Sequence, residues 1–408
     1  MKVLMISPGF PEDLGYFTRG LASVGAQVYG LGDQAPASMD PDVKAALTDY
    51  LPVSNLWEEE ATVQKVVRWL EGSGTTVDRV ECLWEPGVML AARMRERLGI
   101  DGLSVSQANA FRDKEVMKQT LDAAGIRTPH HYRANSGEEI RDAAGRIGWP
   151  IIVKPIDGAG SADTYTARSD EELDQIIDSI KHVPEVSVEE FIEGEEYTYD
   201  TVCAGGQVLF ENVAWYRPKP LVARLNPWIS SQAICLRDLE QPEIAVGVEL
   251  GHKVIEALGF KSGFTHMEWF RTPAGEAVFG EIGARAPGGR LTHGMNMSCD
   301  LDLFSGWAEA VCFGRLSQDT TKKFNAAMVF KRATGGGTHI TGIEGLDSIM
   351  AEHGEHIPLL DLNPVGAPRK DWTKVVTGDG WMVVRHPDLD MTVEIANRLA
   401  GEMRLTTA

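Results

Sequence analysis

The sequence predicts a parallel α/β domain followed by a longer α+β region. In roughly the first hundred residues, apolar strand segments alternate with amphipathic helical segments, a pattern typical of a parallel sheet covered by helices. After that, helices are interleaved with segments that alternate apolar and polar residues with period two, which is typical of antiparallel sheet. At 408 residues the chain is too long for one ordinary core, so we expect two or three domains.

The composition and charge restrict which partners the protein binds. The formal net charge is −20 at pH 7, which argues against a nucleic-acid partner because phosphate backbones bind basic surfaces. The five cysteines show no paired spacing, so we expect reduced thiols and a cytoplasmic location. No window approaches the roughly 18 apolar residues of a membrane span, and Pro8 and Gly9 interrupt the apolar N-terminus too early for a signal peptide. We therefore expect no membrane partner.

The first quarter of the chain reads as three strand–helix units. Each strand segment is short and apolar, and each is followed by a helical segment in which apolar residues recur every three to four positions. The chain has no GxGxxG after the first strand, so a dinucleotide site is not indicated. The predicted strands are residues 2–7, 26–32 and 77–84, and the predicted helices are residues 15–25, 61–73 and 89–100.

The rest of the chain mixes helices and hairpins. Residues 149–167 read as a strand, a glycine-rich turn and a second strand, and residues 262–285 read as a hairpin with its turn at 272–276. Residues 186–216 alternate apolar and polar with period two, which predicts one antiparallel meander. Further helices are predicted over residues 109–126, 136–148, 170–180, 242–260, 301–314 and 391–403, and strands over residues 325–333 and 380–386.

A lysine at the end of a buried strand precedes the glycine-rich turn. Lys154 closes the apolar run "IIVKP", and Gly158, Gly160 and Ser161 follow it. Glycines at such a turn let successive backbone N–H groups face an anion, and the lysine adds a positive charge. A lysine in an otherwise apolar strand is unusual. We therefore favour an anion-binding loop over the alternative, an ordinary glycine-rich hairpin with its lysine in solvent.

Glutamates crowd the segment "VEEFIEGEE" around an apolar pair. The segment contains Glu189, Glu190, Phe191, Ile192 and Glu196. Backbone groups beside Phe191 and Ile192 could pair with the edge of a purine, and Glu196 could accept hydrogen bonds from ribose hydroxyls. The alternative, which the charge run alone favours, is a solvated edge.

Two glutamates face each other across the predicted hairpin 262–285. Glu268 and Glu281 lie at nearly equal distances from the turn on opposite strands, so they are near neighbours across the strand pair. Two like charges side by side are destabilising unless a cation lies between them, and Mg²⁺ takes carboxylate and phosphate oxygens. The hairpin therefore indicates a Mg²⁺ site, and the alternative is that one of the glutamates points into solvent on the other face.

Five segments, in this order, resemble the ATP-grasp superfamily, and within it the carboxylate–amine ligases. They are "NAFRDK" with Lys114, "IIVKP" with "DGAGS", "VEEFIEGEEYTYD", "HMEW" and "EIGAR". The resemblance covers roughly residues 105–310, and the last two segments are most similar to the L-amino acid ligases that make dipeptides, of the bacilysin-synthetase and carnosine-synthase type. It implies an ATP-grasp fold preceded by an N-terminal parallel α/β domain, the pre-ATP-grasp domain.

The resemblance implies a role for most of these residues. Lys114 and Lys154 would hold the phosphates of ATP under a lid formed by the glycine-rich turn. Glu268 and Glu281 would bind Mg²⁺, with two ions expected and Mn²⁺ as a substitute, and Arg285 would stabilise the transferring phosphoryl group together with Lys154. The implied nucleotide-binding set comprises Lys114, Lys154, Gly158, Gly160, Ser161, Glu189, Glu190, Phe191, Ile192 and Glu196.

Other residues near the hairpin are assigned less directly. Arg290 is a further candidate, for the carboxylate of the substrate. Many ATP-grasp enzymes place an asparagine two residues after the second glutamate, where it helps to hold a second Mg²⁺, but this chain has Gly283 there. How a second ion would be held is therefore open. His266 and His293 could act as a base for the amine, but packing or orienting roles are favoured because an amine can also lose its proton to water or phosphate.

The resemblance implies three units. Residues 1–105 would be the N-terminal domain, residues 106–195 the central ATP-grasp subdomain with the lid, and residues 196–408 the C-terminal subdomain with the metal site and an extension. The expected function is an ADP-forming ligase that activates a carboxylate as an acyl-phosphate and joins it to an amine, with an amino acid as each substrate.

Two alternatives to this function stay open. One is an ATP-grasp carboxylase or purine-pathway enzyme that uses bicarbonate or formate, because such enzymes share the ATP site. The other is a non-catalytic nucleotide-binding protein, which the retained glutamates and lysines disfavour. In each case the expected partners are small molecules. The oligomeric state is open, and a homodimer is the common case by base rate.

Overall fold

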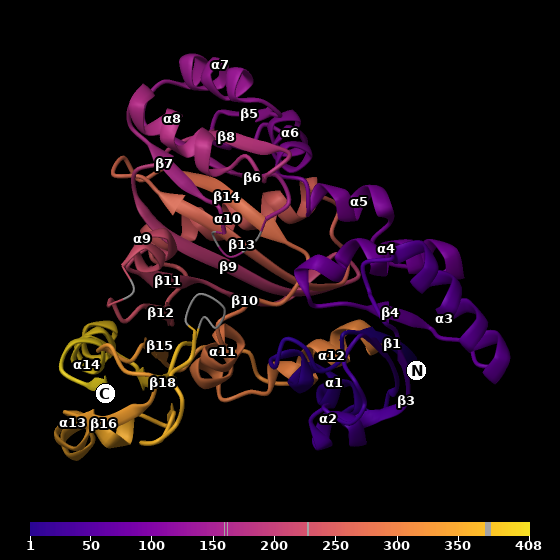
Figure 1. Ribbon diagram of the computed structural model, residues 1–408. Coiled ribbons are helices and arrows are strands. Elements are labelled where there is room, and N and C mark those ends of the chain that lie inside the picture. The colour runs from indigo at the N-terminus through magenta and orange to yellow at the C-terminus, as the bar shows by residue number, and fades with distance from the viewer. Residues whose placement is uncertain (159, 161, 227, 372–376) are drawn as a thin grey trace.

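Four sheets organise the chain. The computed structural model describes residues 1–158, 160, 162–226, 228–371 and 377–408. Among these residues, the strands form a four-stranded N-terminal sheet, a second four-stranded sheet, a nine-stranded sheet and a two-stranded sheet. Figure 1 shows the N-terminal sheet at the lower right, the second four-stranded sheet at the top, and the nine-stranded sheet running from the centre to the lower left.

The N-terminal region forms the parallel α/β unit that the sequence predicts. Its strands lie in the order β3-β2-β1-β4, and every pairing is parallel. The strand β3 was not predicted, because "LTDYLP" carries polar residues and none of its six residues is buried at this edge of the sheet. The elements are β1 (Lys2–Ile6), α1 (Leu14–Ser23), β2 (Gln27–Gly32), α2 (Pro41–Ala46), β3 (Leu47–Pro52), α3 (Glu59–Ser73), β4 (Arg79–Glu81), a short 3-10 helix η1 (Glu85–Gly87) and α4 (Val88–Leu98).

The single helix predicted over residues 109–126 is wrong, because the chain forms two helices there. Helix α5 (Val105–Ala110) ends before a turn, and α6 (Lys114–Ala123) starts after it. The break has a local cause: the Asp113 side chain accepts hydrogen bonds from the first backbone N–H groups of α6 and caps the new helix. As a result, Lys114 is the first residue of α6, and its backbone N–H donates to the carbonyl of Ile156 beside the glycine-rich turn.

The second four-stranded sheet carries the glycine-rich turn. Its strands lie in the order β5-β8-β6-β7, with antiparallel pairings. Two helices cover its outer face at the top of Figure 1, and their apolar residues form a core with the strands. The Ser136 side chain caps the first of these helices by accepting a hydrogen bond from the backbone N–H of Glu139. The elements are β5 (His131–Ala134), α7 (Gly137–Ile147), β6 (Ile151–Pro155), β7 (Tyr165–Ala167), α8 (Asp170–Ser179) and β8 (Val186–Glu190).

The meander predicted over residues 186–216 is wrong in one respect, because the chain changes sheet within it. Strand β8 belongs to the second sheet, whereas β9 begins the nine-stranded sheet. The crossing lies at 191–194, where Gly194 passes so close to the hairpin turn that a Cβ would lie 2.2 Å from the backbone oxygen of Arg271. The strands of the large sheet are β9 (Glu195–Ala204), β10 (Gln207–Asn212), β11 (Ala214–Arg217), β12 (Gln232–Cys235), β13 (Gly263–Arg271), β14 (Ala277–Gly283), β15 (Asn325–Lys331), β17 (Leu359–Leu362) and β18 (Gly380–His386).

Helices pack on the large sheet and attach the N-terminal unit to it. Phe17 of α1 packs edge-to-face against Phe264, Phe304 and Trp307, and all four side chains are buried in a core shared between the two units. No helix in the described part of the chain is long and apolar enough to cross a membrane. The remaining elements are α9 (Pro220–Leu225), α10 (Pro242–Ala257), α11 (Leu291–Cys299), α12 (Leu303–Phe313), β16 (Ile340–Glu344), α13 (Leu346–His353), η2 (Gly354–His356), α14 (Leu389–Gly401) and β19 (Arg404–Thr407).

Candidate active site

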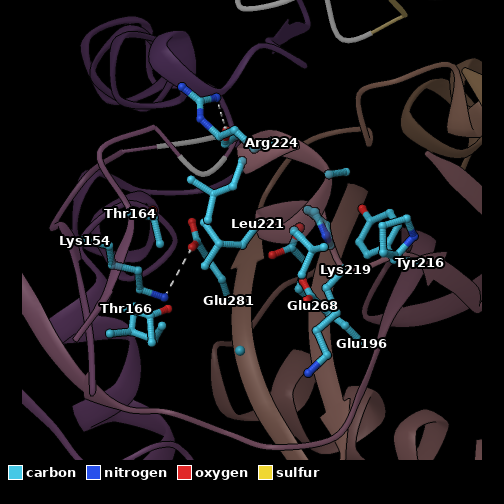
Figure 2. Close-up of a pocket in the computed structure, with 18 of the residues that line it drawn as sticks. Lys154, Thr164, Thr166, Glu196, Tyr216, Lys219, Leu221, Arg224, Glu268 and Glu281 are labelled. Carbon is cyan, nitrogen blue, oxygen red and sulfur yellow. Dashed lines mark hydrogen bonds and ion pairs between the residues drawn. The ribbon is translucent and has the colours of Figure 1, made fainter. Parts of the chain in front are cut away.

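A large cavity lies between the second sheet and the nine-stranded sheet. Its volume is about 1490 Å³. Ordinary small-molecule pockets measure roughly 300–1,000 Å³, so this cavity has room for a nucleotide and a second molecule. Strand β6 approaches from one side and the hairpin of β13 and β14 from the other (Figure 2). The candidate residues that line it are Lys114, Lys154, Gly158, Gly160, Glu189, Glu190, Phe191, Ile192, Glu196, Glu268, Glu281 and Arg285.

The two hairpin glutamates meet in register, as counted from the turn. Glu268 of β13 is paired directly with Glu281 of β14, and a bulge follows Glu268. Burial raises the pKa of Glu268, and the charge of Glu281 raises it further against the opposing effect of His266. Burial together with Glu268 also raises the pKa of Glu196, to about 8. These shifts show negative charge gathered where a cation would relieve it.

The donor set fits Mg²⁺ bound partly by its ligand. Within the described ranges, no group of three or more His, Cys, Asp or Glu side chains is arranged to hold a metal ion by itself. Mg²⁺ is commonly held by one or two carboxylates, with phosphate oxygens and water completing its coordination. Glu268 and Glu281 supply such a pair, so the residues present fit the metal that the sequence indicates.

Two lysines reach the same glutamate from the opposite side of the cavity. Nζ of Lys114 lies 3.2 Å from Glu281 and donates to the carbonyl of Gly158 at 2.8 Å. Nζ of Lys154 lies 3.9 Å from Glu281, as the dashed line in Figure 2 marks, and 3.0 Å from Glu189. Burial alone would raise the pKa of Glu281, but Lys114 and Lys154 lower it. The carboxylate is therefore held charged beside two cations that can also bind phosphate.

A buried ion pair behind the cavity was missed by the sequence reasoning. Nζ of Lys118 is fully buried and lies 2.7 Å from Glu189. Burial lowers the pKa of Lys118 to about 8, while Glu189 acts in the opposite direction. Despite its burial, Glu189 has a pKa far below its usual range, because Lys118 and Lys154 both face it. Glu189 thus pairs with Lys154 as well as with Lys118, and its carboxylate is engaged by the protein.

The crossing between the two sheets offers groups for a purine. Phe191 and Ile192 line the cavity there. Glu190 accepts from the backbone N–H of His130 at 3.1 Å and pairs with Arg127 at 3.0 Å, so its carboxylate is engaged with the protein. The side chains free to contact a ligand at this point are therefore the apolar pair.

The two arginines of the hairpin segment have different surroundings. Arg285 lines the cavity, and its Nε donates to Glu85 at 2.6 Å. Arg290 does not line the cavity: it is buried and forms ion pairs with Glu12, at 2.9 Å, and with Asp13. Of these two, Arg285 is placed to meet a ligand, whereas Arg290 ties the start of α11 to the N-terminal unit.

The two candidate histidines also differ. Nδ1 of His266 lies 2.6 Å from the buried carboxylate of Asp200, and its Nε2 lies 3.8 Å from Glu268 at the cavity wall. Thr198 donates to the other oxygen of Asp200 at 2.7 Å and fixes the carboxylate. Nε2 is therefore the ring nitrogen of His266 that lies nearer Glu268 at the cavity wall. His293 is packed among aromatic rings, and burial lowers its pKa to about 4, which fits the packing role favoured from the sequence.

The glycine-rich turn and helix α9 both border the cavity. Gly158 and Gly160 of the glycine-rich turn line it, while Ser161 lies outside the described residues. Helix α9 lies opposite this turn, and Nη1 of Arg224 in α9 donates to the carbonyl of Gly160 at 3.1 Å (Figure 2). The sequence patterns predict no element over α9, so its contact with the glycine-rich turn was not expected.

Comparison with known proteins identifies the fold. A model of the ATP-grasp domain matches residues 111–214. The fold resembles the crystal structure of an L-amino acid ligase from Bacillus licheniformis, with a TM-score of 0.79 and 18% identity, covering 100% of this chain and 98% of that one. It also resembles N5-carboxyaminoimidazole ribonucleotide synthetase from Thermotoga maritima, with a TM-score of 0.73 and 17% identity, covering 100% and 99%. The chain therefore has the ATP-grasp fold, and residues 111–214 match the family's ATP-grasp domain.

By sequence, the chain is similar to amino acid ligases. It is 27% identical over 234 residues to the L-arginine-specific L-amino acid ligase of Bacillus subtilis. The aligned part covers 56% of this chain and 56% of that protein, so the chain matches just over half the length of this curated relative. The resemblance stated from the sequence motifs is confirmed.

Proposed function

We propose that the protein is an ATP-dependent carboxylate–amine ligase that forms ADP and joins two amino acids. The observation that carries the proposal is the register pair Glu268 and Glu281, set opposite Lys114 and Lys154 across a cavity large enough for a nucleotide and a substrate. Sequence similarity to an L-amino acid ligase supports the choice of substrates.

We propose the following placement of ATP. The purine would lie beside Phe191 and Ile192, where the chain crosses between the sheets, and Glu196 would accept hydrogen bonds from the ribose. Lys114 and Lys154 would contact the phosphates under the glycine-rich lid. Since Glu189 holds Lys154 and is itself held by Lys118, the positive charge at the phosphates is fixed before the nucleotide arrives.

Glu268 and Glu281 would hold Mg²⁺, one or two ions, with Mn²⁺ as a substitute. When bound, the metal would neutralise phosphate charge and align the phosphoryl group for transfer. The protein contributes by holding both carboxylates side by side on the hairpin. Lys114 and Lys154 also keep Glu281 charged. These contributions exist in the protein alone and can be tested without substrate.

The reaction would proceed in two steps. An oxygen of the substrate carboxylate attacks the γ-phosphorus of ATP, ADP leaves, and an acyl-phosphate forms. The amine nitrogen then attacks the carbonyl carbon, the C–O bond to phosphate breaks, and inorganic phosphate leaves with one carboxylate oxygen. Arg285 would stabilise the transferring phosphoryl group and the later oxyanion. The lid and α9 exclude water, which would otherwise hydrolyse the acyl-phosphate.

The amine must lose a proton during the second step. Nε2 of His266 is the acceptor that the geometry offers, because Asp200 accepts the Nδ1 proton and fixes the tautomer. The resulting imidazolium would be stabilised by the buried Asp200 carboxylate. His266 would then act as a proton acceptor, in place of the packing or orienting role favoured from the sequence.

The fold alone does not choose between an amino acid ligase and a carboxylase that uses bicarbonate. Solved structures of an L-amino acid ligase and of an N5-carboxyaminoimidazole ribonucleotide synthetase both match the fold, each at under 20% identity. The sequence similarity to an amino acid ligase favours the ligase. We further propose that the units 1–105, 106–195 and 196–408 act as domains, that the enzyme works in the cytoplasm, which its five free cysteines fit, and that it forms a homodimer.

A substrate panel tests the proposal. The protein, Mg²⁺ and ATP are incubated with single amino acids, with pairs of amino acids, and with bicarbonate, and ADP release is measured with the product identified by mass. ADP release that requires two amino acids, together with a dipeptide product, supports the ligase. Release with bicarbonate and one further substrate supports the carboxylase, and no release in any arm would overturn both. Glu268→Gln serves as the inactive control.

A further inference from the structure

We propose that Glu85, a carboxylate of the N-terminal unit, is a positioning residue of this site that holds Arg285 in place and links it to the base of the lid. The proposal rests on the proposed function for the role of Arg285, but its structural part stands independently. Glu85 lies shortly after the end of β4, in the loop that leaves this parallel strand, and begins the 3-10 helix η1. It therefore lies beyond the carboxyl end of the strand, where ligand sites of such sheets usually lie. It is 9% exposed and lines the cavity.

The carboxylate of Glu85 binds two guanidinium groups at once. Oε2 accepts from Nε of Arg285 at 2.6 Å, and Oε1 accepts from Nη1 of Arg112 at 2.6 Å. The group of three carries a net charge of about +1 beside the cavity, counted from one carboxylate and two guanidinium groups. A carboxylate already engaged by two arginines is a poor partner for a substrate ammonium. The arrangement therefore suits an anion next to Arg285 and leaves Glu85 as the group that sets its orientation.

Arg285 is held in a way that leaves part of it available. Its Nε donates to Glu85, and its Nη1 donates to the carbonyl of Ala286 at 2.9 Å. Nη2 has no hydrogen-bond partner among the residues that the structure describes, and the side chain lines the cavity. Because two nitrogens are fixed by the protein, the third has a defined direction before a ligand binds, which is the preorganisation that charge stabilisation requires.

Gly283 makes room for this carboxylate. A Cβ at position 283 would lie 2.7 Å from Oε2 of Glu85, too close for any side chain to fit without moving it. Position 283 lies two residues after Glu281 on β14, so both positions face the same side of the strand. The oxygen of Glu85 thus stands where a side chain at position 283 would begin, and a group from another unit fills the space that this glycine leaves.

The other arginine extends the link to the lid. Arg112 lies in the turn between α5 and α6, and its Nη2 donates to the carbonyl of Asp157 at 2.8 Å. Asp157 immediately precedes Gly158 at the base of the lid. One carboxylate of the N-terminal unit therefore joins the turn before α6, the lid base and Arg285. Loss of its charge should disturb the chemical step more than nucleotide binding, which depends mainly on other residues.

The first test removes the charge and keeps the shape. We expect Glu85→Gln to lower kcat about 10- to 100-fold while KM for ATP stays within about three-fold, since one neutral group replaces a charge-assisted partner of Arg285. Glu85→Asp, which keeps the charge on a shorter side chain, should retain more activity than Glu85→Gln. The control is Glu59→Gln, which breaks a 2.5 Å ion pair with Arg93 in the same unit but away from the cavity.

The outcomes separate this inference from the proposed function. If the wild type makes dipeptide and Glu85→Gln matches it in kcat, the positioning role is wrong while the ligase stands. If the wild type makes no dipeptide, the ligase is wrong, and the second test still decides whether Glu85 and Gly283 interact. A purely structural role for Glu85 would lower the thermal midpoint and leave kcat per folded molecule unchanged, which would also contradict the proposal.

The second test needs no substrate. Gly283→Ala should lower the thermal midpoint of the wild type, by roughly 2–4 °C, because its methyl group collides with Glu85. In a Glu85→Ala background the same substitution should cost little, since the colliding carboxylate is gone. Additive effects of the two substitutions would show that they do not share this space and would overturn the geometric basis of the inference.

Discussion

At the scale of single residues, Glu281 is the side chain on which the proposed chemistry depends most directly. It faces Glu268 across the hairpin and has Lys114 and Lys154 on its other side. We expect Glu281→Gln, which keeps the shape and removes the charge, to lower the rate of ADP release by about 10²- to 10³-fold. Glu276→Gln, on the exposed turn of the same hairpin, is the matched control. A Glu281→Gln variant with normal turnover would refute the metal assignment.

Glu196 gives the cavity a dependence on pH that can be measured without ligands. Burial and the charge of Glu268 raise its pKa from 4.5 to about 8. Between these two values the folded state keeps a proton that the unfolded state has released, so this group's contribution to stability is lost as the pH rises. In metal-free protein, we therefore expect Glu196→Gln to raise the thermal midpoint, and more at about pH 8.5 than at about pH 5.

The control for this measurement is Glu193→Gln, an exposed glutamate in the same segment. Its effect on the thermal midpoint should be small and equal at both pH values. If the gain from Glu196→Gln were the same at both pH values, Glu196 would not be held protonated in the folded protein.

Single residues of the site were predicted from the sequence where a local rule applied. Glu268 and Glu281 follow from counting along a hairpin, and Lys154 from its place at the end of an apolar strand. Glu85 and Lys118 were missed, because their partners come from distant parts of the chain and no local pattern marks them. The position of Glu85 after a parallel strand was the one available signal.

At the scale of elements, the contact between α9 and the glycine-rich turn is the feature that the sequence did not suggest. Nη1 of Arg224 donates to the carbonyl of Gly160. We expect Arg224→Ala to loosen this closure, so that more ADP is released for each dipeptide formed, because water reaches the acyl-phosphate. The ratio of ADP to dipeptide, measured in one reaction, reports this directly.

The control for the closure is Arg141→Ala, which removes an exposed ion pair with Asp174 on α7 and α8. That variant should keep the wild-type ratio of ADP to dipeptide. An unchanged ratio in Arg224→Ala as well would mean that the contact does not exclude water.

Most elements were predicted because their patterns are local. Helix α10, the hairpin of β13 and β14, and the parallel pairing of the N-terminal strands all match the expectation. One continuous helix was predicted over residues 109–126 because an apolar face runs through the whole segment. The N-cap at Asp113 starts a new helix there, and the apolar pattern does not reveal this break. The change of sheet after β8 was missed because a period-two pattern shows that a segment is extended but not which sheet it joins.

At the scale of the whole molecule, three units meet at one cavity. The second sheet brings Lys154 and the lid, the nine-stranded sheet brings Glu268 and Glu281, and the N-terminal unit brings Glu85. The packing of α1 on α12 fixes the N-terminal unit against the large sheet, so that a carboxylate from the first hundred residues reaches the site. The order of the motifs predicted the fold class, but the contribution of the N-terminal unit to the site required the structure.

The acyl-phosphate is the central claim, and oxygen transfer tests it most directly. An amino acid labelled with ¹⁸O in its carboxylate is incubated with the protein, Mg²⁺, ATP and the amine substrate found in the panel, and the released phosphate is analysed by mass. We expect one ¹⁸O atom in inorganic phosphate for each dipeptide formed, since the bond that breaks is the C–O bond of the acyl-phosphate. Dipeptide formation with unlabelled phosphate would contradict it.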